Sequence, residues 1–355
     1  MVDYLERFVD RFDLRRLIRF RTRVTSAIPR EGGWEIEAGG NHELFSAIVV
    51  ATGFNSVPRY PDLPGQFDGF QLHTHDYRTP DPFAARDVVV VGLGCSAAEL
   101  ACEIASVAKS VTIAARSASW IVPRRLGPVP LDWFDTRSGS RIPFGIRRRA
   151  MVPLFRLAAG PLKRTGLPRP DHRLGDKPIT VCDDLLRLLR GRQITVSAPI
   201  VRLGGDRVVD AASREIKCDA LLFGTGYRTA VEFLPPEADP PSNERAPLYR
   251  GVVSQALPGL FYVGIVVAHG ALIPMMEAQA NWAADVLAGN LALPSPDEMR
   301  RSVELDGAVR RRQFDPRFGF IWDRLAYCRA LESESRHSRR HPGSRAVRAA
   351  AATVG

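Results

Sequence analysis

The segment Gly92-Leu93-Gly94-Cys95-Ser96-Ala97 carries the most specific chemical pattern in the sequence. It matches GxGxxA, it follows the apolar run 87–91, and it leads into a stretch with helical periodicity. In such a turn Gly92 permits the tight bend, Gly94 lets a pyrophosphate approach the backbone, and Ala97 allows close helix–strand packing. Phosphates would then face the free N–H groups at the helix N-terminus. The pattern predicts a dinucleotide site; the alternative is a glycine-rich turn that binds nothing.

Arg116 ends the next apolar run, 111–116. Sites that select NAD place an acidic residue near this point, where it accepts from the ribose 2′-hydroxyl. A guanidinium instead pairs bidentately with a 2′-phosphate. The position therefore favours NADPH, with a solvated surface arginine as the alternative. Arg124 and Arg125 either assist or lie on the surface.

Strand and helix patterns around these residues indicate an α/β protein. Residues 87–116 read as a β-turn-α-β unit. Two further buried strands end alike, in Ala51-Thr52-Gly53 and Gly224-Thr225-Gly226. The other expected elements are a helix at 4–20, a hairpin of 24–28 with 34–38, short strands at 195–196, 202–203 and 208–209, a strand at 260–265, and helices at 184–191 and 275–289.

Composition excludes several classes of protein. The chain has 355 residues and a formal net charge of +10, but no recognised nucleic-acid motif. Its five cysteines show neither CxxC nor metal-ligand spacing, and it opens without a signal peptide, so we expect a reduced, cytoplasmic protein without a metal site. The basic stretch 141–164 could lie on a membrane, although helices over a cleft are the preferred interpretation. The basic tail 331–355 is expected to be disordered.

A third pattern, Phe67-x-Gly69-xxx-His73-xxx-Tyr77, precedes the glycine-rich turn. The order FxGxxxHxxxY then GxGxSA resembles the flavin-containing monooxygenases, the class B flavoprotein monooxygenases. Further blocks, among them CDALLFGTGY and PGLFYVG, extend the resemblance over nearly all of residues 4–290. Baeyer–Villiger monooxygenases carry Trp where Tyr77 stands, which favours oxygenation of a heteroatom.

The resemblance implies two intertwined Rossmann-like domains. Residues 1–82 and 219–330 would form a partial FAD-binding domain. Residues 83–218 would bind NADPH and carry a helical insertion at about 120–175. Within the NADPH domain, the family implies that Gly92, Gly94, Ser96 and Ala97 line the pyrophosphate and that Arg116 binds the 2′-phosphate.

The other implied residues lie where the chain passes between the domains or close to the flavin. Ala51, Thr52 and Gly53 form one crossing turn, and Gly224, Thr225 and Gly226 form the other. Gly264 would lie near the ribityl-phosphate side of the flavin. His73 and Tyr77 would stand near the inter-domain cleft in architectural roles, and no catalytic residue is assigned.

The implied reaction uses NADPH, FAD and O2 to oxygenate a nitrogen or sulfur of a small molecule, leaving substrate and oligomeric state open. Three alternatives remain: a Baeyer–Villiger enzyme, a disulfide or quinone reductase, and a remnant that binds NADPH only. The family opens with its own GxGxxG for FAD, and no such motif precedes Tyr4. We therefore expect an N-terminally truncated chain that binds FAD poorly, through an upstream start codon, a remnant gene or a segment supplied by another chain.

Overall fold

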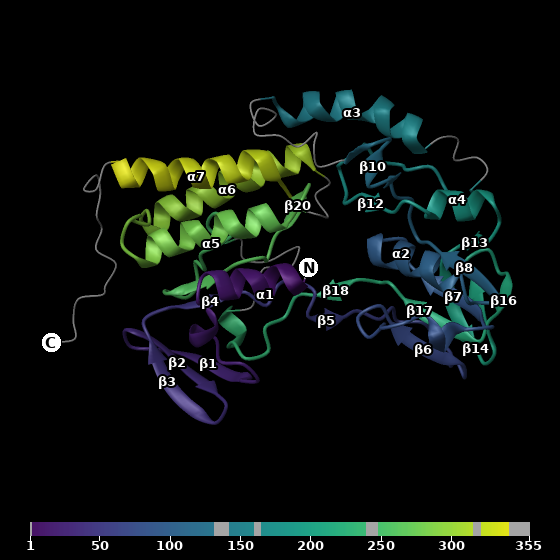
Figure 1. Ribbon diagram of the computed structural model, residues 1–355, viewed down its shortest axis with the longest axis horizontal. Coiled ribbons are helices and arrows are strands. Elements are labelled where there is room, and N and C mark those ends of the chain that lie inside the picture. Colours follow the sequence, from purple (N-terminus) through teal and green to yellow (C-terminus); the bar gives the residue numbers. More distant parts are fainter. Residues whose placement is uncertain (1, 131–141, 160–164, 239–247, 315–320, 341–355) are drawn as a thin grey trace.

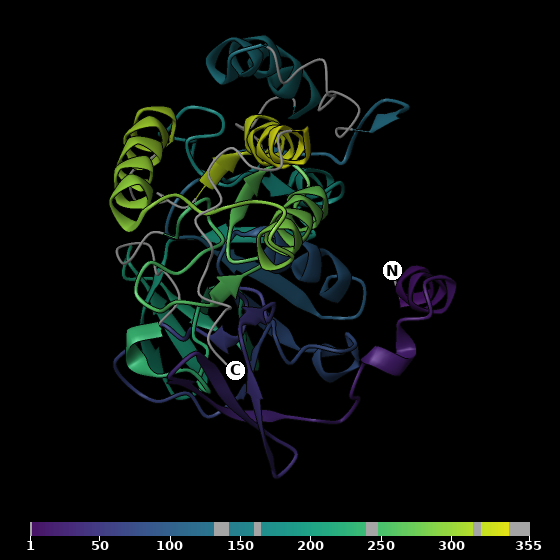
Figure 2. The same ribbon diagram turned by 90° about the vertical axis from the view of Figure 1, so that its left-hand side faces the viewer.

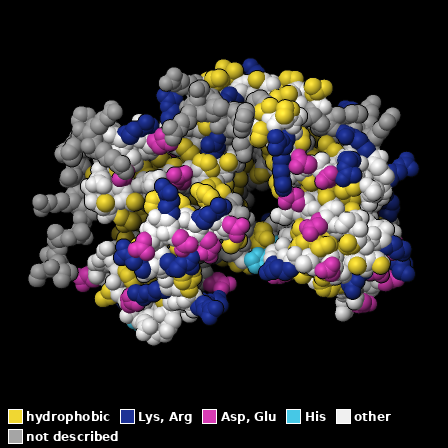
Figure 3. Space-filling view, viewed as in Figure 1, with side chains coloured by type: hydrophobic (Ala, Val, Ile, Leu, Met, Phe, Trp, Pro, Cys, Tyr) yellow, Lys and Arg dark blue, Asp and Glu magenta, His cyan; other side chains and the backbone are white. Residues whose placement is uncertain are grey.

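The computed structural model describes residues 2–130, 142–159, 165–238, 248–314 and 321–340. The molecule has two lobes, seen at the left and right of Figure 1, and the space-filling view shows a hollow between them (Figure 3). We call them the nucleotide lobe, which contains the glycine-rich turn, and the helical lobe, which contains both the N-terminal and the C-terminal helices.

A parallel five-stranded sheet forms the centre of the nucleotide lobe, in the order β13-β8-β7-β17-β6. Its strands are β6 (Phe70–His73), β7 (Asp87–Val91), β8 (Ser110–Ala114), β13 (Ile194–Ser197) and β17 (Ala220–Phe223). The central residues of β7 are buried on both faces, as an apolar run in a covered parallel sheet requires. Since all five strands run the same way, their carboxyl ends meet at one edge.

Two layers cover this sheet. Helices α2 (Cys95–Ile104) and α4 (Leu185–Arg190) pack on one face through alanine and leucine side chains. An antiparallel sheet of β14 (Ile200–Gly204), β15 (Arg207–Asp210) and β16 (Glu215–Lys217) packs on the other face. Strands β6 and β17 belong to the five-stranded parallel sheet, although they lie outside the 83–218 range expected for the NADPH-binding domain.

The helical lobe combines short sheets with three long helices. A meander of β1 (Val24–Arg30), β2 (Gly33–Ala38) and β3 (Asn41–Phe45) packs its buried Trp34 against the parallel pair β4 (Ile48–Val50) and β19 (Leu260–Tyr262). The helices are α5 (Ile273–Leu287), α6 (Pro296–Gln313) and α7 (Arg324–Arg340), which share a core around Trp282 (Figure 2). A second parallel pair joins β20 (Val267–His269) to β21 (Ile321–Asp323).

Two neighbouring strands carry the chain between the lobes. β5 (Val57–Pro58) leads into the nucleotide lobe, and β18 (Tyr227–Arg228) leads out of it, antiparallel to β5. The backbone N–H of Arg59 donates to the carbonyl of Gly226 at 3.0 Å. Helix α3 (Phe144–Ala159) lies above both lobes as a third connection (Figure 1).

Short elements complete the described chain. The two-stranded pieces are β9 (Ile121–Val122) with β12 (Thr180–Val181), and β10 (Arg125–Leu126) with β11 (Val129–Pro130). Single turns of 3-10 helix occupy Arg15–Leu17, Asp81–Phe83 and Pro236–Ala238. None of the helices among the described residues combines the length and the apolar character needed to cross a bilayer.

The hairpin, the β-turn-α-β unit and the helix ended by Gly191 are confirmed, but three expectations were wrong in part. The first helix, α1 (Val2–Arg11), stops early because Asp13 takes a left-handed conformation with φ 49°. The tail expected to be disordered from 331 is helical to Arg340, because Leu331 is buried in the α5–α7 core. The region 120–175, expected to be a helical insertion, contains the strands β9–β11 as well as α3. The last part of the expected tail, 341–355, lies outside the described residues.

Candidate functional site

The glycine-rich turn joins β7 to α2 through contacts that leave no room for side chains on its inner side. Gly92 has φ +123°, and a Cβ there would lie 2.3 Å from the carbonyl oxygen of Gly224. A Cβ on Gly224 would in turn lie 2.5 Å from the Cβ of Ala97, which is fully buried. The turn, the start of α2 and the end of β17 are therefore in direct backbone contact.

Gly94 lies on the outer side of the same turn, in a different environment. It is the N-cap of α2, it is exposed, and a Cβ added to it would meet nothing within 4 Å. Ser96, in the first turn of the helix, is exposed as well. Because the first N–H groups of a helix have no partner within it, this open surface is suited to an anionic group.

A cleft of about 730 Å³ opens in front of Gly94, at the carboxyl edge of the parallel sheet. Arg116 lies at the cleft after β8, and no described residue forms a hydrogen bond or ion pair with it. The cleft thus places an open helix start and an unpaired guanidinium in one cavity. It is lined by Arg59, Tyr60, Pro61, Asp62, Val91, Gly92, Leu93, Gly94, Cys95, Ala114, Arg116, Ser117, Ala118, Ser119, His172, Lys177, Pro178, Ile179, Thr180, Pro199, Ile200, Gly224 and Thr225.

Two further basic residues at the cleft, Arg59 and Lys177, were missed by the sequence analysis. Lys177 is mostly buried, forms an ion pair with Asp171 at 3.5 Å and lines the cleft wall. No local pattern could have identified it, because the loop that contains it reaches the cleft only through contacts with the distant turn 92–97.

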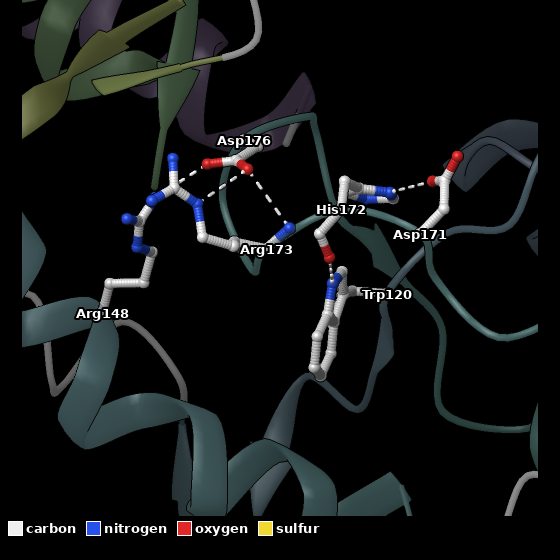
Figure 4. Close-up of polar contacts among 6 residues, drawn as sticks. All are labelled: Trp120, Arg148, Asp171, His172, Arg173 and Asp176. Carbon is white, nitrogen blue, oxygen red and sulfur yellow. Dashed lines mark hydrogen bonds and ion pairs between the residues drawn. The ribbon is translucent and has the colours of Figure 1, made fainter. Parts of the chain in front are cut away.

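A network of hydrogen bonds and ion pairs holds the loop 171–180 in place (Figure 4). The indole N–H of Trp120 donates to the carbonyl of His172 at 3.1 Å. Asp176 accepts from the backbone N–H of Arg173 at 3.1 Å and from the Arg148 guanidinium at 2.7 Å. Farther along the loop, the Thr180 hydroxyl donates to the carbonyl of Leu93 at 2.8 Å. The loop is thereby fastened to the glycine-rich turn.

His73 lies where the two crossing strands meet the sheet. It is fully buried; its Nδ1 accepts from the backbone N–H of His75 at 3.1 Å, so Nε2 carries the proton and donates to the Gly226 carbonyl, also at 3.1 Å. Burial lowers the pKa of His73 below its usual value. The ring is thus fully hydrogen-bonded and lines no part of the nucleotide cleft, which agrees with the architectural role expected for His73.

The rest of the Phe67–Tyr77 pattern is likewise structural. Phe67 is buried, and a Cβ on Gly69 would lie 2.7 Å from its ring. The ring of Tyr77 stacks on Phe83 with centroids 6.0 Å apart, and Tyr77 does not line the nucleotide cleft; its place near the inter-domain cleft stays a prediction. Burial, together with the nearby Glu103 carboxylate, raises the pKa of Tyr77 to about 12. The tyrosine therefore packs against the helical layer behind the sheet.

In the helical lobe, the turn 51–53 and Gly264 lie at the carboxyl edge of the pair β4–β19. The N–H of Val263 donates to the carbonyl of Val50 at 2.9 Å, which places the two strand ends side by side. Gly53 has φ +73° and Gly264 has φ +84°. The backbone N–H of Gly264 donates to the buried Oε1 of Gln279 at 2.9 Å, which fixes the position of this turn.

The two cofactors implied by the sequence fit these sites unequally. NADPH fits the cleft, because Gly94 leaves space for a pyrophosphate and Arg116 is free for a 2′-phosphate. For FAD the described residues fit only in part. The edge beside Gly53 is open, but no second glycine-rich turn leads from a described strand of the helical lobe into a helix, so the ADP half has no cradle there.

The parallel sheet with its glycine-rich turn, next to a lobe built on the parallel pair β4–β19, defines an α/β dinucleotide-binding fold, and comparison with known proteins gives the family. Residues 1–319 match the family described as flavin-binding monooxygenase-like. The chain belongs to this family.

Individual relatives agree with this assignment. Flavin-containing monooxygenase 5 of Oryctolagus cuniculus is 30% identical over 85% of this chain and 60% of its own length. Flavin-containing monooxygenase 1 of Rattus norvegicus is 28% identical over 94% of this chain and 65% of its own length. The chain thus spans less than two thirds of the length of these relatives.

Solved structures share the fold. S-allyl-L-cysteine S-oxygenase from Allium sativum superimposes with a TM-score of 0.67 at 23% identity, over 97% of this chain and 71% of that one. The closed form of cyclohexanone monooxygenase gives a TM-score of 0.71 at 18% identity, over 95% of this chain and 82% of that one. Both similarities confirm the expected α/β fold and are consistent with two Rossmann-like domains.

Proposed function

We propose that the cleft in front of Gly94 binds NADPH and that the chain provides the NADPH-binding part of a flavin-dependent monooxygenase. The observation that carries this proposal is the contrast between the two glycines of one turn. Gly92 and Gly224 lack side chains because protein atoms lie against them, whereas Gly94 faces open space in which only a ligand would require the absence of a Cβ.

Each group at the cleft then has a binding role. The N–H groups at the start of α2 hold the pyrophosphate, and Ser96 stands beside them in the first turn. Arg116 pairs with the 2′-phosphate, and Lys177 adds a second positive charge on the opposite loop. Thr225 lies at the cleft and also binds the carbonyl of Arg59, so it joins bound nucleotide to the crossing strands.

The complete reaction that we propose transfers one oxygen atom of O2 to a nucleophilic nitrogen or sulfur of a small molecule, with NADPH as the reductant and FAD as the second cofactor. Family membership and the S-oxygenase among the structural neighbours support this choice. The fold is shared with cyclohexanone monooxygenase, so oxidation of a carbonyl compound is the competing reaction. Parallel NADPH-oxidation and oxygen-uptake assays with a sulfide, an amine and a cyclic ketone distinguish the two.

A second candidate function is NADPH binding without oxygenation. It is favoured by the lack of a second glycine-rich cradle among the described residues of the helical lobe. We expect weak flavin binding by this chain, measured as substoichiometric absorbance in the flavin bands of the purified protein. A stoichiometric yellow protein would instead support the full monooxygenase reaction in this chain alone.

Substitution Gly94→Thr tests the nucleotide site directly. Threonine preserves an N-cap for α2, and its Cβ meets no protein atom, so the fold should be retained. The same Cβ occupies the space proposed for the pyrophosphate, so NADPH should no longer raise the melting temperature. If the variant binds NADPH as tightly as the wild type by calorimetry, the proposal is wrong. Ser106→Ala, at an exposed site beyond the end of α2, is the matched control.

A further inference from the structure

Two cysteines that are 80 residues apart in sequence face each other behind the nucleotide site. Cys102 is in the last turns of α2, and Cys182 directly follows β12. Their Sγ atoms are 3.8 Å apart, and neither residue lines the cleft. Cys182 is buried, whereas Cys102 is half-buried.

Backbone contacts hold both residues in place. Cys102 lies within a regular helix that packs on α4, and the N–H of Cys182 donates to the carbonyl of Val122 at 3.0 Å. A disulfide requires an S–S distance of about 2.05 Å, so the sulfur atoms must approach by somewhat under 2 Å. Rotation of two cysteine side chains and a small shift of α2 can supply that movement.

The two thiols are also chemically unequal. The hydrogen bond from Cys102 lowers the pKa of Cys182 to about 7, and the backbone N–H groups of Leu185 and Asp184 act in the same direction. The same hydrogen bond, together with burial, raises the pKa of Cys102. The contact therefore lowers the pKa of the Cys182 thiol and raises the pKa of the Cys102 thiol, which favours Cys182 as the nucleophile of the pair.

We propose that Cys102 and Cys182 are a reversible oxidation site that forms a disulfide with hydrogen peroxide. The Cys182 thiolate attacks one peroxide oxygen, the O–O bond breaks, and hydroxide leaves, which gives a sulfenic acid at Cys182. The Cys102 sulfur then displaces that hydroxyl group, the S–S bond forms, and water leaves with the Cys102 proton. The two thiols lose two electrons and two protons, and the peroxide becomes two molecules of water.

The disulfide would have a direct structural consequence for the cleft. It would tie α2, which begins at the glycine-rich turn, to β12, whose Thr180 binds the carbonyl of Leu93. It would also close a long loop of the unfolded chain, so the oxidised protein should melt several degrees higher than the reduced protein. Dithiothreitol should reverse both the bond and the shift.

The test uses the full-length chain, treated with hydrogen peroxide after complete reduction. We expect a loss of two hydrogen atoms in intact mass and a linked peptide containing Cys102 and Cys182 after proteolysis. Cys102→Ser keeps a hydrogen-bond donor beside Cys182 but cannot complete the disulfide, so its Cys182 should accumulate a sulfenic acid that dimedone labels. Cys218→Ser is the matched control, since burial raises the pKa of Cys218 to about 12 and no cysteine contacts it.

Two results would overturn the proposal. One is a wild-type protein whose peroxide-treated peptides contain no Cys102–Cys182 link. The other is a Cys102→Ser protein without a dimedone adduct at Cys182. Neither readout depends on NADPH or flavin, so the oxidation site and the proposed monooxygenase function can fail separately.

Discussion

Arg147 and Arg148 are adjacent in α3, yet their guanidinium groups bind carboxylates in different lobes. Arg147 pairs with Asp323 on β21 of the helical lobe. Arg148 pairs with Asp176, on the loop that forms one wall of the nucleotide cleft, at 2.7 Å (Figure 4). All four side chains are mostly buried. These two ion pairs fix helix α3 to both lobes, in addition to the packing of Phe144 on the helical lobe and of Phe155 on the nucleotide lobe.

We expect the two arginines to differ in their effect on stability. Asp176 keeps a bond from Arg173 when Arg148→Gln is made, whereas Asp323 loses its charged partner in Arg147→Gln. The loss should be about 1.5–3 kcal/mol for Arg147→Gln, as for a hydrogen bond to a charged group, and smaller for Arg148→Gln. Urea unfolding measures both, with the exposed neighbour variant Arg149→Gln as control. Equal losses would contradict this account of the helix.

Arg116 should decide between the two nicotinamide nucleotides. We expect Arg116→Gln to weaken NADPH binding roughly 10- to 150-fold, because a hydrogen bond to a charged group contributes about 1.5–3 kcal/mol. NADH binding should be nearly unchanged. Arg187→Gln, whose arginine pairs with Asp184 and does not line the cleft, should change neither. Isothermal calorimetry with both nucleotides provides the comparison, and a parallel loss of NADH affinity would argue against a 2′-phosphate contact.

Gly92 should be required for folding rather than for binding alone. Alanine at this position would carry a strained φ of +123° and a Cβ 2.3 Å from a backbone oxygen. Backbone strain of this kind costs on the order of 1–3 kcal/mol before the steric contact is added. We therefore expect Gly92→Ala to lower the free energy of unfolding by more than about 2 kcal/mol. Thermal melts without nucleotide measure it; a wild-type melting temperature would show that the turn adapts.

His73 should make the protein less stable in mild acid. Its folded-state pKa is lowered by burial, so the unfolded chain takes up the proton first as the pH falls. The free energy that the neutral His73 contributes to folding is fully present above pH about 6.5. It is lost as the pH falls from there toward the folded-state pKa of His73. His73→Gln, which can still donate to Gly226, should remove that part of the pH dependence, and the exposed His75→Gln should not. Urea midpoints between pH 5 and 8 test the difference.

The elements with strong local signals were predictable from sequence. The parallel unit 87–116 combines two apolar runs with a glycine-rich turn. The helices before Gly191 and Gly289 combine helical periodicity with a glycine stop. All three are found in the structure. The glycine-rich turn joins a strand to a helix, as predicted, because the residues that such a turn requires are consecutive in the sequence. The end of α1 was not predictable in this way, since one left-handed residue, Asp13, interrupts a continuing helical pattern.

Features that depend on distant contacts could not be read from the chain. Lys177 and Cys182 derive their positions from a loop whose hydrogen bonds reach residues about 60 to 90 positions away, such as Val122 and Leu93. Tyr77 belongs to a pattern near the crossing strands, yet packing against Phe83 decides where its ring lies. Local sequence gives residue chemistry, and tertiary packing decides which of those residues meet.

The paired crossing strands β5 and β18 make the nucleotide lobe a cassette. It is one uninterrupted stretch of chain, roughly 59–226, and its entrance and exit lie side by side. The backbone N–H of Arg59 donates to the carbonyl of Gly226 at 3.0 Å, and the hydroxyl of Thr225 donates to the carbonyl of Arg59. The helical lobe, in contrast, is assembled from segments on either side of that stretch. An exchange of this cassette between relatives would replace the whole parallel sheet through two neighbouring chain junctions, and it would also exchange helix α3, whose Arg147 must again find a carboxylate at Asp323.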